Sequence, residues 1–254
     1  MKGIGHIEIQ QVCLGYKSGL DIRTVIQDLS LTLDAGSFTS LIGASGCGKS
    51  TLLNAIGGHY KPLSGSIILD GVEIKTPGAD LGIVFQQHTL FPWKTVKENV
   101  RFGPMRRGVG RAAADKLADE YIELVGLSGY ENYYPKMLSG GMQHRAEIAR
   151  ALANKPAVLL MDEPFGALDA QMRASLQDSL LSIWESTHVT IVFVTHDVNE
   201  AIRLSQRVVI ISRRSGSISS IIETNKNHDE PVEQYMQSRQ TQELKRRCLE
   251  MLSA

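Results

Sequence analysis

The sequence predicts an α/β fold in which a mixed sheet is preceded by an N-terminal antiparallel β-subdomain and interrupted by an inserted α-helical subdomain. Short runs within residues 6–74 alternate apolar and polar side chains, which is typical of half-buried antiparallel strands. Over residues 95–153 the apolar positions recur at helical spacing instead. Strand and helix patterns then alternate over residues 157–212, as they do in parallel sheets.

The first third of the chain contains the expected antiparallel strands and one buried strand. The alternating runs cover residues 6–16, 25–33 and 65–74. Turn residues separate them at Ser18-Gly19, Asp34-Ala35-Gly36 and Asp70-Gly71. Between the second and third runs, "FTSLIGASGCGKSTLLNAIGG" indicates an apolar strand, a glycine loop and a short helix that ends at Gly57-Gly58. These elements predict a mixed sheet built around one buried central strand.

The helical segment follows from periodicity and capping residues. Residues 112–127 predict a helix with one apolar stripe, formed by Ala114, Leu117, Tyr121, Ile122, Leu124 and Val125. Residues 139–153 predict a second helix with Ser139 as its N-cap. We expect residues 5–225 to form one domain, with its helical insert at about 88–153, and residues 226–254 to form a peripheral C-terminal helix.

The charge balance and the cysteine pattern limit the possible partners and surroundings. Lys plus Arg and Asp plus Glu number 27 each among 254 residues, so we expect no nucleic-acid partner. The three cysteines are far apart and lack CxxC spacing, which favours reduced thiols in a cytosolic protein. The seven histidines form no HxxxH or Cys/His pattern, so the sequence predicts no structural zinc. No apolar run approaches the length of a membrane span.

A glycine loop at residues 43–50 matches the phosphate-binding pattern G-x-x-x-x-G-K-[ST] at every required position. Small residues let successive backbone N–H groups turn toward phosphate oxygens, and the following helix adds the positive end of its dipole. We expect Lys49 to reach the β and γ phosphates and the Ser50 hydroxyl to bind Mg²⁺. A bound nucleotide should slow alkylation of Cys47. The predicted nucleotide-binding residues of the loop are Gly43, Ala44, Ser45, Gly46, Cys47, Gly48, Lys49, Ser50 and Thr51.

Two adjacent carboxylates end a predicted buried strand. Residues 158–161, "VLLM", are apolar, and Asp162 and Glu163 follow them. Ligands bind outside the carboxyl ends of strands in open α/β sheets, so both carboxylates should lie at the site. We expect Asp162 to hold Mg²⁺ through water and Glu163 to orient and polarise the attacking water.

Three single residues complete this part of the candidate site. His196, in "THD" after an apolar strand, can hydrogen-bond a γ phosphate. Gln86 follows "LGIVF" where the core gives way to the helical insert, and its amide can contact Mg²⁺ or water. Tyr16 is an aromatic residue in an early predicted turn and can stack on adenine, although core or turn packing accounts for it nearly as well.

A second helix start with small residues lies at Ser139, Gly140 and Gly141. Like the first loop, it offers free N–H groups and a positive dipole end, so it is a second predicted anion site. Two interpretations fit this site. It binds a different anion, or it meets the same nucleotide from another copy of the chain, and the spacing alone does not decide between them.

Together these residues resemble the ATP-binding cassette family, specifically its transporter ATPase subunits. The resemblance covers about residues 5–215 and implies a P-loop NTPase core, with a RecA-like mixed sheet, that hydrolyses ATP with Mg²⁺. The matching motifs occur in the family's order: Tyr16, the loop at 43–51, Gln86, "LSGG" at 138–141, "LLMDEP" at 159–164, "ALD" at 167–169 and "THD" at 195–197.

The resemblance also implies a use for the second anion site. In this family two nucleotide-binding domains pair head to tail, and the LSGG of one closes on the γ phosphate held by the other. By resemblance, Glu163 is the catalytic base, His196 a γ-phosphate contact and Asp169 a cross-dimer contact. The family commonly has glutamine where this chain has Met142 and His144. Because the Ser-Gly-Gly start is intact, we expect activity to survive this difference.

Longer phrases look like the nitrate, sulfonate and taurine group of bacterial importers. The likeness implies a homodimeric ATPase, peripheral at the cytoplasmic face of the inner membrane, that is bound to transmembrane permease subunits and served indirectly by a solute-binding protein. It also implies that the segment from Gln86 to Trp93 docks on the permease. The phrases are "FQQHTLFPW", "PFGALDAQMR" and "SIWESTHVTIVFVTHDVNEAI".

Two other functions compete with ATP-driven import. Cassette ATPases of DNA repair or translation tend to carry two cassettes, long coiled coils or basic insertions, and this sequence shows one cassette and zero net charge. An unrelated P-loop kinase or GTPase would not need LSGG, and the sequence has no Asn-Lys-x-Asp guanine motif. Import energised by ATP hydrolysis is therefore the leading prediction.

Overall fold

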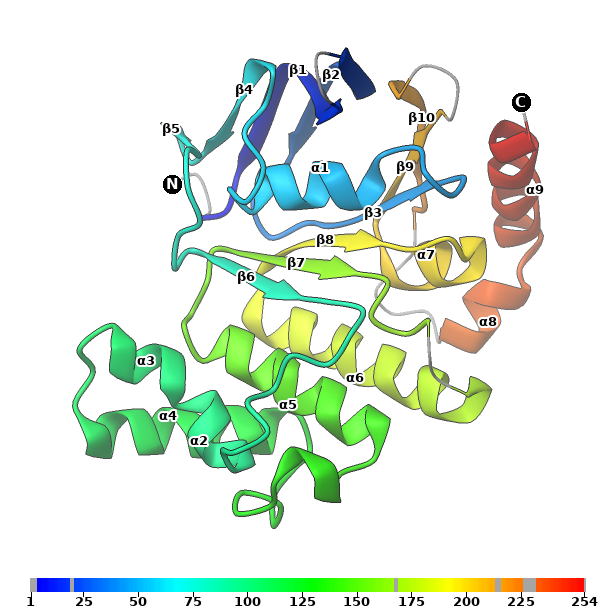
Figure 1. Cartoon of the computed structure of the whole chain (residues 1–254). Coiled ribbons are helices and arrows are strands. Elements are labelled where there is room, and N and C mark those ends of the chain that lie inside the picture. The colour runs from blue at the N-terminus through cyan, green and yellow to red at the C-terminus, as the bar shows by residue number, and fades with distance from the viewer. Residues whose placement is uncertain (1–3, 19–20, 167–168, 213–215, 226–231, 254) are drawn as a thin grey trace. The chain divides into compact units, whose positions relative to one another are not determined.

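The computed structural model describes residues 4–18, 21–166, 169–212, 216–225 and 232–253 (Figure 1). The chain forms two compact units, one from Met1–Gly78 with Thr190–Ala254 and one from Ala79–Val189. The first unit holds an antiparallel sheet and parallel strands, and the second holds parallel strands and most of the helices. The predicted α/β class, with antiparallel strands at the N-terminus and an α-helical segment between α/β parts, is confirmed.

The N-terminal sheet of the first unit is antiparallel throughout and has the strand order β2-β1-β4-β5. In β1 the buried side chains are Ile7 and Ile9 and then Val12 and Leu14, so the alternation changes phase within the strand. Gln11, with φ of 48°, lies where the register shifts, and this irregularity explains the phase change. The strands are β1 (Ile7–Ser18), β2 (Asp21–Leu33), β4 (Ser64–Leu69) and β5 (Val72–Glu73).

The predicted Asp70-Gly71 turn joins β4 to β5. Both residues have positive φ, 49° and 85°, as a two-residue type I′ hairpin turn requires. The Asp70 carboxylate also accepts the backbone N–H groups of Gly5 and His6, each at 2.9 Å. The turn therefore also fixes the chain just before β1.

The other strands of the first unit flank the buried strand β3 (Phe38–Gly43), in the order β10-β9-β3-β8. All six β3 residues are buried, and β3 runs parallel to β8 and β9 while β10 is antiparallel to β9. A strand covered on both faces carries a continuous apolar run, which is the pattern that the sequence shows here. The remaining elements are α1 (Lys49–Ile56), β8 (Thr190–Val194), α7 (Val198–Leu204), β9 (Arg207–Ile211) and β10 (Ile218–Glu223).

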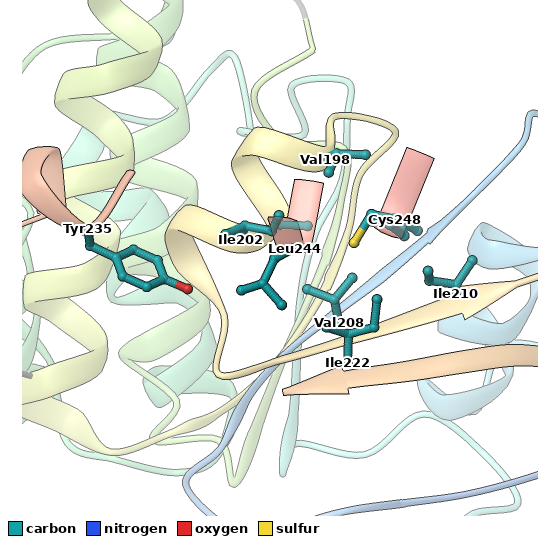
Figure 2. Packing of buried hydrophobic residues seen from close by; sticks show 10 residues of the cluster. Val198, Ile202, Val208, Ile210, Ile222, Tyr235, Leu244 and Cys248 are labelled. Atoms are coloured by element: carbon teal, nitrogen blue, oxygen red, sulfur yellow. The ribbon is translucent and has the colours of Figure 1, made fainter. Parts of the chain in front are cut away.

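The C-terminal residues form α8 (Val232–Gln237) and α9 (Arg239–Ser253). The peripheral helix predicted for residues 226–254 thus contains a break, and residues 226–231 lie outside the described part of the chain. Leu244 and Cys248 of α9 pack into one buried cluster with Ile202 of α7 and strand residues such as Val208 (Figure 2). The Tyr235 hydroxyl of α8 donates to the Thr224 carbonyl at 2.8 Å.

The second unit pairs β6 (Leu81–Val84) with β7 (Val158–Asp162) in parallel and contains the predicted helical insert. The predicted stripe of α4 is partly wrong, because Leu124 is exposed and Ala118 is buried in its place, beside Ala114 and Ile122. Small residues there let α4 lie close to its neighbours α2 and α5. The helices are α2 (Val96–Val100), α3 (Phe102–Arg106), α4 (Arg111–Leu124), the 3₁₀ turn Pro135–Met137, α5 (Gly140–Leu152) and α6 (Ala170–Thr187).

Within the described part of the chain, every helix is too short or too polar to cross a membrane.

Candidate functional site

The phosphate loop connects β3 to α1 in the first unit. Gly46 and Gly48 have φ of 80° and 103°, which residues with side chains rarely adopt. A Cβ at Gly43 would lie 2.7 Å from the Ile211 carbonyl, whereas a Cβ at Gly46 would meet no described atom within 4 Å. The loop is therefore tightly packed where it leaves β3 and open at Gly46, which fits a cradle for phosphate groups.

Lys49 and Cys47 lie on the inner side of this loop. The Lys49 ammonium is buried and donates to the carbonyls of Gly43 at 2.8 Å and Ala44 at 3.2 Å. Cys47 is 2% exposed, and burial raises the pKa of its thiol, although the Lys49 charge and backbone N–H groups lower it. Cys47 can therefore serve a nucleotide through its backbone, while its thiol is poorly placed for alkylation even before nucleotide binds.

Tyr16 lies within β1, so the prediction that it occupies a turn is wrong. Its side chain remains 42% exposed, and its ring packs edge-on against Tyr60 with centroids 5.3 Å apart. Its hydroxyl is 2.7 Å from Thr51 Oγ1 in the first turn of α1. The structure thus places an exposed aromatic ring beside the phosphate loop. The contact with Thr51 joins positions 35 residues apart and could not be predicted from the sequence.

His196 is exposed in the segment between β8 and α7 of the same unit. Asp197 caps α7 by accepting from the Asn199 N–H at 2.7 Å, and the Asp197 N–H donates to Thr195 Oγ1 at 3.0 Å. The cap fixes the backbone on either side of His196. His196 and Asp197 also line a pocket of about 360 Å³ together with α9 residues, including Lys245.

Asp162, Glu163 and Gln86 lie at the carboxyl ends of two neighbouring strands of the second unit. Val84 of β6 is in register with Met161 of β7, so the segments that follow both strands leave the same edge. A Cβ at Gly166 would lie 3.6 Å from the Gln86 amide nitrogen and 3.6 Å from the Glu163 carbonyl oxygen. Glu163 has φ of 45°, a conformation that is uncommon outside glycine and is often found at functional positions.

Ser139, Gly140 and Gly141 begin α5, as predicted. The Ser139 hydroxyl caps the helix by accepting from the Met142 N–H at 3.3 Å, and Ser139 is exposed. Gly141 is buried against α6, where an added Cβ would lie 2.6 Å from Met172 Sδ. Gly141 thus serves helix packing, and the exposed N-terminal end of α5 is formed by Ser139 and the partly buried Gly140.

Asp169 caps α6 and accepts from the Met172 N–H at 2.9 Å. The first two residues of "ALD", 167 and 168, lie outside the described residues. His144, at one of the positions that differ from the family, is 1% exposed in α5. Burial, followed by the nearby His88, lowers the pKa of His144, while Glu147 and the Gly140 backbone act in the opposite direction. The neutral imidazole therefore dominates at neutral pH.

Comparisons with known proteins agree on one family. Residues 26–166 match the family model described as ABC transporter. The chain is 50% identical to an uncharacterised ABC transporter ATP-binding protein of Methanocaldococcus jannaschii, over 78% of this chain and 74% of the relative. It is 45% identical to the aliphatic sulfonates import ATP-binding protein SsuB of Bacillus thuringiensis subsp. konkukian, over 86% of each chain. It is 42% identical to the nitrate import ATP-binding protein NrtD of Synechocystis sp., over 89% of this chain and 85% of NrtD.

Solved structures give the same result. A dimeric ATP-binding cassette in a post-hydrolysis state, bound to ADP and phosphate, superposes with a TM-score of 0.74 at 33% identity. The match covers 87% of this chain and all of that one. The phosphate loop, the carboxylates that end β7 and the Ser-Gly-Gly start of α5 thus occur in a chain with the sequence and the fold of one known family. The chain belongs to the ABC transporter family and is an ATP-binding cassette.

Proposed function

We propose that this cassette hydrolyses ATP to energise the import of a small anion of the sulfonate or nitrate kind through separate permease subunits. The observation that carries the proposal is the 45% identity to SsuB over 86% of both chains. NrtD, at 42% identity, supports the same substrate class. No observation on this chain favours the alternative of a cassette acting in DNA repair or translation.

The phosphate loop is proposed to hold the triphosphate of ATP. Backbone N–H groups of residues 43–51 would face the phosphate oxygens, and Lys49 would exchange its bonds to the loop carbonyls for bonds to phosphate. Tyr16 would stack on the adenine ring. Ser50, Gln86 and Asp162 carry the oxygen atoms that Mg²⁺ prefers, and bound Mg²⁺ would offset the phosphate charge.

Glu163 is the proposed catalytic base and would orient the water that attacks the γ phosphate. His196 would hydrogen-bond that phosphate, at a position fixed by the cap of α7. Gln86, which lies beside the turn after Glu163, would report the state of the nucleotide to the helical insert.

Ser139, Gly140 and Gly141 are proposed to act across a homodimer. The polarised start of α5 in one copy would face the γ phosphate bound to the other copy, and Asp169 would contact the opposite copy. The dimeric states of the structurally similar cassettes support this arrangement. ATP binding would then close the dimer and hydrolysis would loosen it.

The membrane-facing roles rest on the second unit. We propose that the segment from Gln86 to Trp93 docks on a permease, since Trp93 is 69% exposed and its ring centroid lies 5.7 Å from that of Phe91. The protein would be peripheral at the cytoplasmic face of the membrane, and a solute-binding protein would deliver the solute to the permease. Residues 5–225 would form the nucleotide-binding domain, with its insert at about 88–153, and residues 226–254 its peripheral C-terminal part.

Genetic complementation tests this function, with the chain expressed in place of SsuB or NrtD. The chain is expressed together with its own permease subunits in a Bacillus strain that lacks SsuB, and growth on an aliphatic sulfonate as sulfur source is measured. The matched experiment uses a Synechocystis strain that lacks NrtD and nitrate as nitrogen source. We expect growth in one strain and none with Lys49→Ala. Failure in both strains, with ATPase activity intact, would contradict the proposed substrate class.

A further inference from the structure

Three potential metal ligands meet in the helical part of the second unit. They are His88, in the segment after β6, and His144 and Glu147 on α5. One ligand atom from each residue lies within 4.8 Å of the other two. His88 Nδ1 is 3.2 Å from Glu147 Oε2, and the two imidazole rings have centroids 4.4 Å apart. Residues three apart on a helix share a face, which brings His144 and Glu147 together.

The burial and the poor hydrogen bonding of the His144 side chain indicate a bound ligand. Its side chain is 1% exposed, and neither ring nitrogen has a partner in regular hydrogen-bond geometry among the residues that the structure describes. The Gly140 backbone lies close enough to raise the pKa of the ring, but it can serve only one of the two nitrogens. Buried polar atoms are nearly always paired, so a buried imidazole with at least one unpaired nitrogen, beside another imidazole and a carboxylate, indicates a missing partner. A metal ion bound by one of these nitrogens supplies it.

Glu147 is held in the orientation of a ligand. Its Oε1 accepts hydrogen bonds from the backbone N–H of Thr89 and from the Thr89 hydroxyl, which leaves Oε2 facing His88. Arg150 in turn donates to the Thr89 carbonyl at 2.6 Å. Hydrogen bonds of this kind orient ligands in known metal sites. His88 is exposed, so an ion can enter from the solvent side.

We propose that His88, His144 and Glu147 form a binding site for a divalent transition metal of the zinc class. Two imidazoles and one carboxylate suit Zn²⁺ better than Mg²⁺ or Ca²⁺, which prefer oxygen ligands alone. Ligand atoms of tetrahedral zinc lie about 3.3–3.5 Å apart, so the present arrangement has to contract by about 1.5 Å at most. His88 Nδ1 and Glu147 Oε2, at 3.2 Å, are already close enough for this geometry, so the contraction concerns the distances to His144. When a metal ion is bound, the site connects His88, two residues after Gln86, to α5, the helix that Ser139 caps.

Metal titration of the full chain, with any affinity tag removed and without nucleotide, tests the site. Zn²⁺ affinity is measured by competition with a chromogenic chelator, and Co²⁺ is used as a spectroscopic probe of coordination. We expect one ion per chain, with visible Co²⁺ bands typical of four or five ligands. His88→Gln and His144→Gln should each weaken binding by at least about 100-fold, because losing a ligand exceeds the 10–100-fold cost of losing an outer partner.

Two features of these variants separate loss of the site from misfolding. His144→Gln introduces the residue that the family commonly carries, and His88→Gln changes an exposed side chain. His59→Gln is the matched control, since His59 is exposed in the other unit. Zn²⁺ should raise the melting temperature of the wild type and His59→Gln but not of the other two variants. Absence of chain-stoichiometric binding in the wild type, or equal binding by all four proteins, would overturn the proposal.

Discussion

Replacing Gly48 by alanine tests the geometry of the phosphate loop. The φ of Gly48 is 103°, and an added Cβ would lie 2.7 Å from Ile26 Cδ1 and 2.9 Å from Val25 Cγ1. Ile26 is fully buried, so it has little room to move. Backbone strain at positive φ costs about 1–2 kcal/mol, and overpacking adds about 1–3 kcal/mol. We expect Gly48→Ala to lower the free energy of unfolding by about 2–5 kcal/mol.

Two other glycines separate the components of this effect. Gly71, in the β4–β5 turn, has φ of 85°, and its added Cβ would meet no described atom within 4 Å. Gly71→Ala therefore measures backbone strain alone, about 1–2 kcal/mol. Gly46, with φ of 80°, has equally open surroundings but lies in the loop. Gly46→Ala should match Gly71→Ala in stability and differ from it by weaker ATP binding.

The stability of the three variants is measured by urea denaturation, and ATP binding by equilibrium titration. The expected order of stability is Gly71→Ala equal to Gly46→Ala, with Gly48→Ala clearly lower. A Gly48→Ala protein as stable as Gly71→Ala would refute the packing between the loop and β2. A Gly46→Ala protein with unchanged ATP affinity would refute the claim that this loop holds the phosphate groups.

Three further predictions concern single side chains. Cys47 should react with a thiol reagent more slowly than the partly exposed Cys13, and its rate should still rise above pH 9, because burial raises its pKa from 9.0. Mass spectrometry of each labelled cysteine checks this, and equal rates would contradict it. A hydrogen bond from Arg101, more than any other contact, lowers the pKa of Asp115. Asp115→Asn should therefore lower the free energy of unfolding at neutral pH, but not at pH values below the pKa of Asp115 in the folded protein. Urea denaturation at a series of pH values measures this difference. Trp93→Ala should leave folding and basal ATP hydrolysis unchanged and reduce permease-dependent transport, and transport at the normal rate would remove Trp93 from the docking surface.

Much of the fold could be predicted because its signals are local. Alternating side chains, the Asp-Gly turn and the capping residue Ser139 each act within a few residues of the chain. The phase change at Gln11 could not be predicted in this way, since a bulge depends on the strand that pairs with it. The buried face of α4 likewise depends on neighbouring helices, which select Ala118 over Leu124.

The candidate site shows the same division. The phosphate loop is a continuous motif, so its strand-loop-helix context could be predicted in full. The burial of the Cys47 thiol depends on packing beneath the loop and was missed. The group of His88, His144 and Glu147 joins positions 56 residues apart, so no short spacing pattern reveals it. The available sequence signal was the pair of ligands three residues apart on α5.

The central claim is that two copies of this chain hold ATP between the phosphate loop of one and the α5 start of the other. Sedimentation of Glu163→Gln, with and without Mg-ATP, tests it most directly. We predict a dimer with Mg-ATP and a monomer without it. Adding Gly140→Asp should abolish the dimer but not ATP binding, because a carboxylate at the first position of α5 suits the helix dipole and repels phosphate. A Glu163→Gln protein that binds ATP and remains monomeric would contradict the claim.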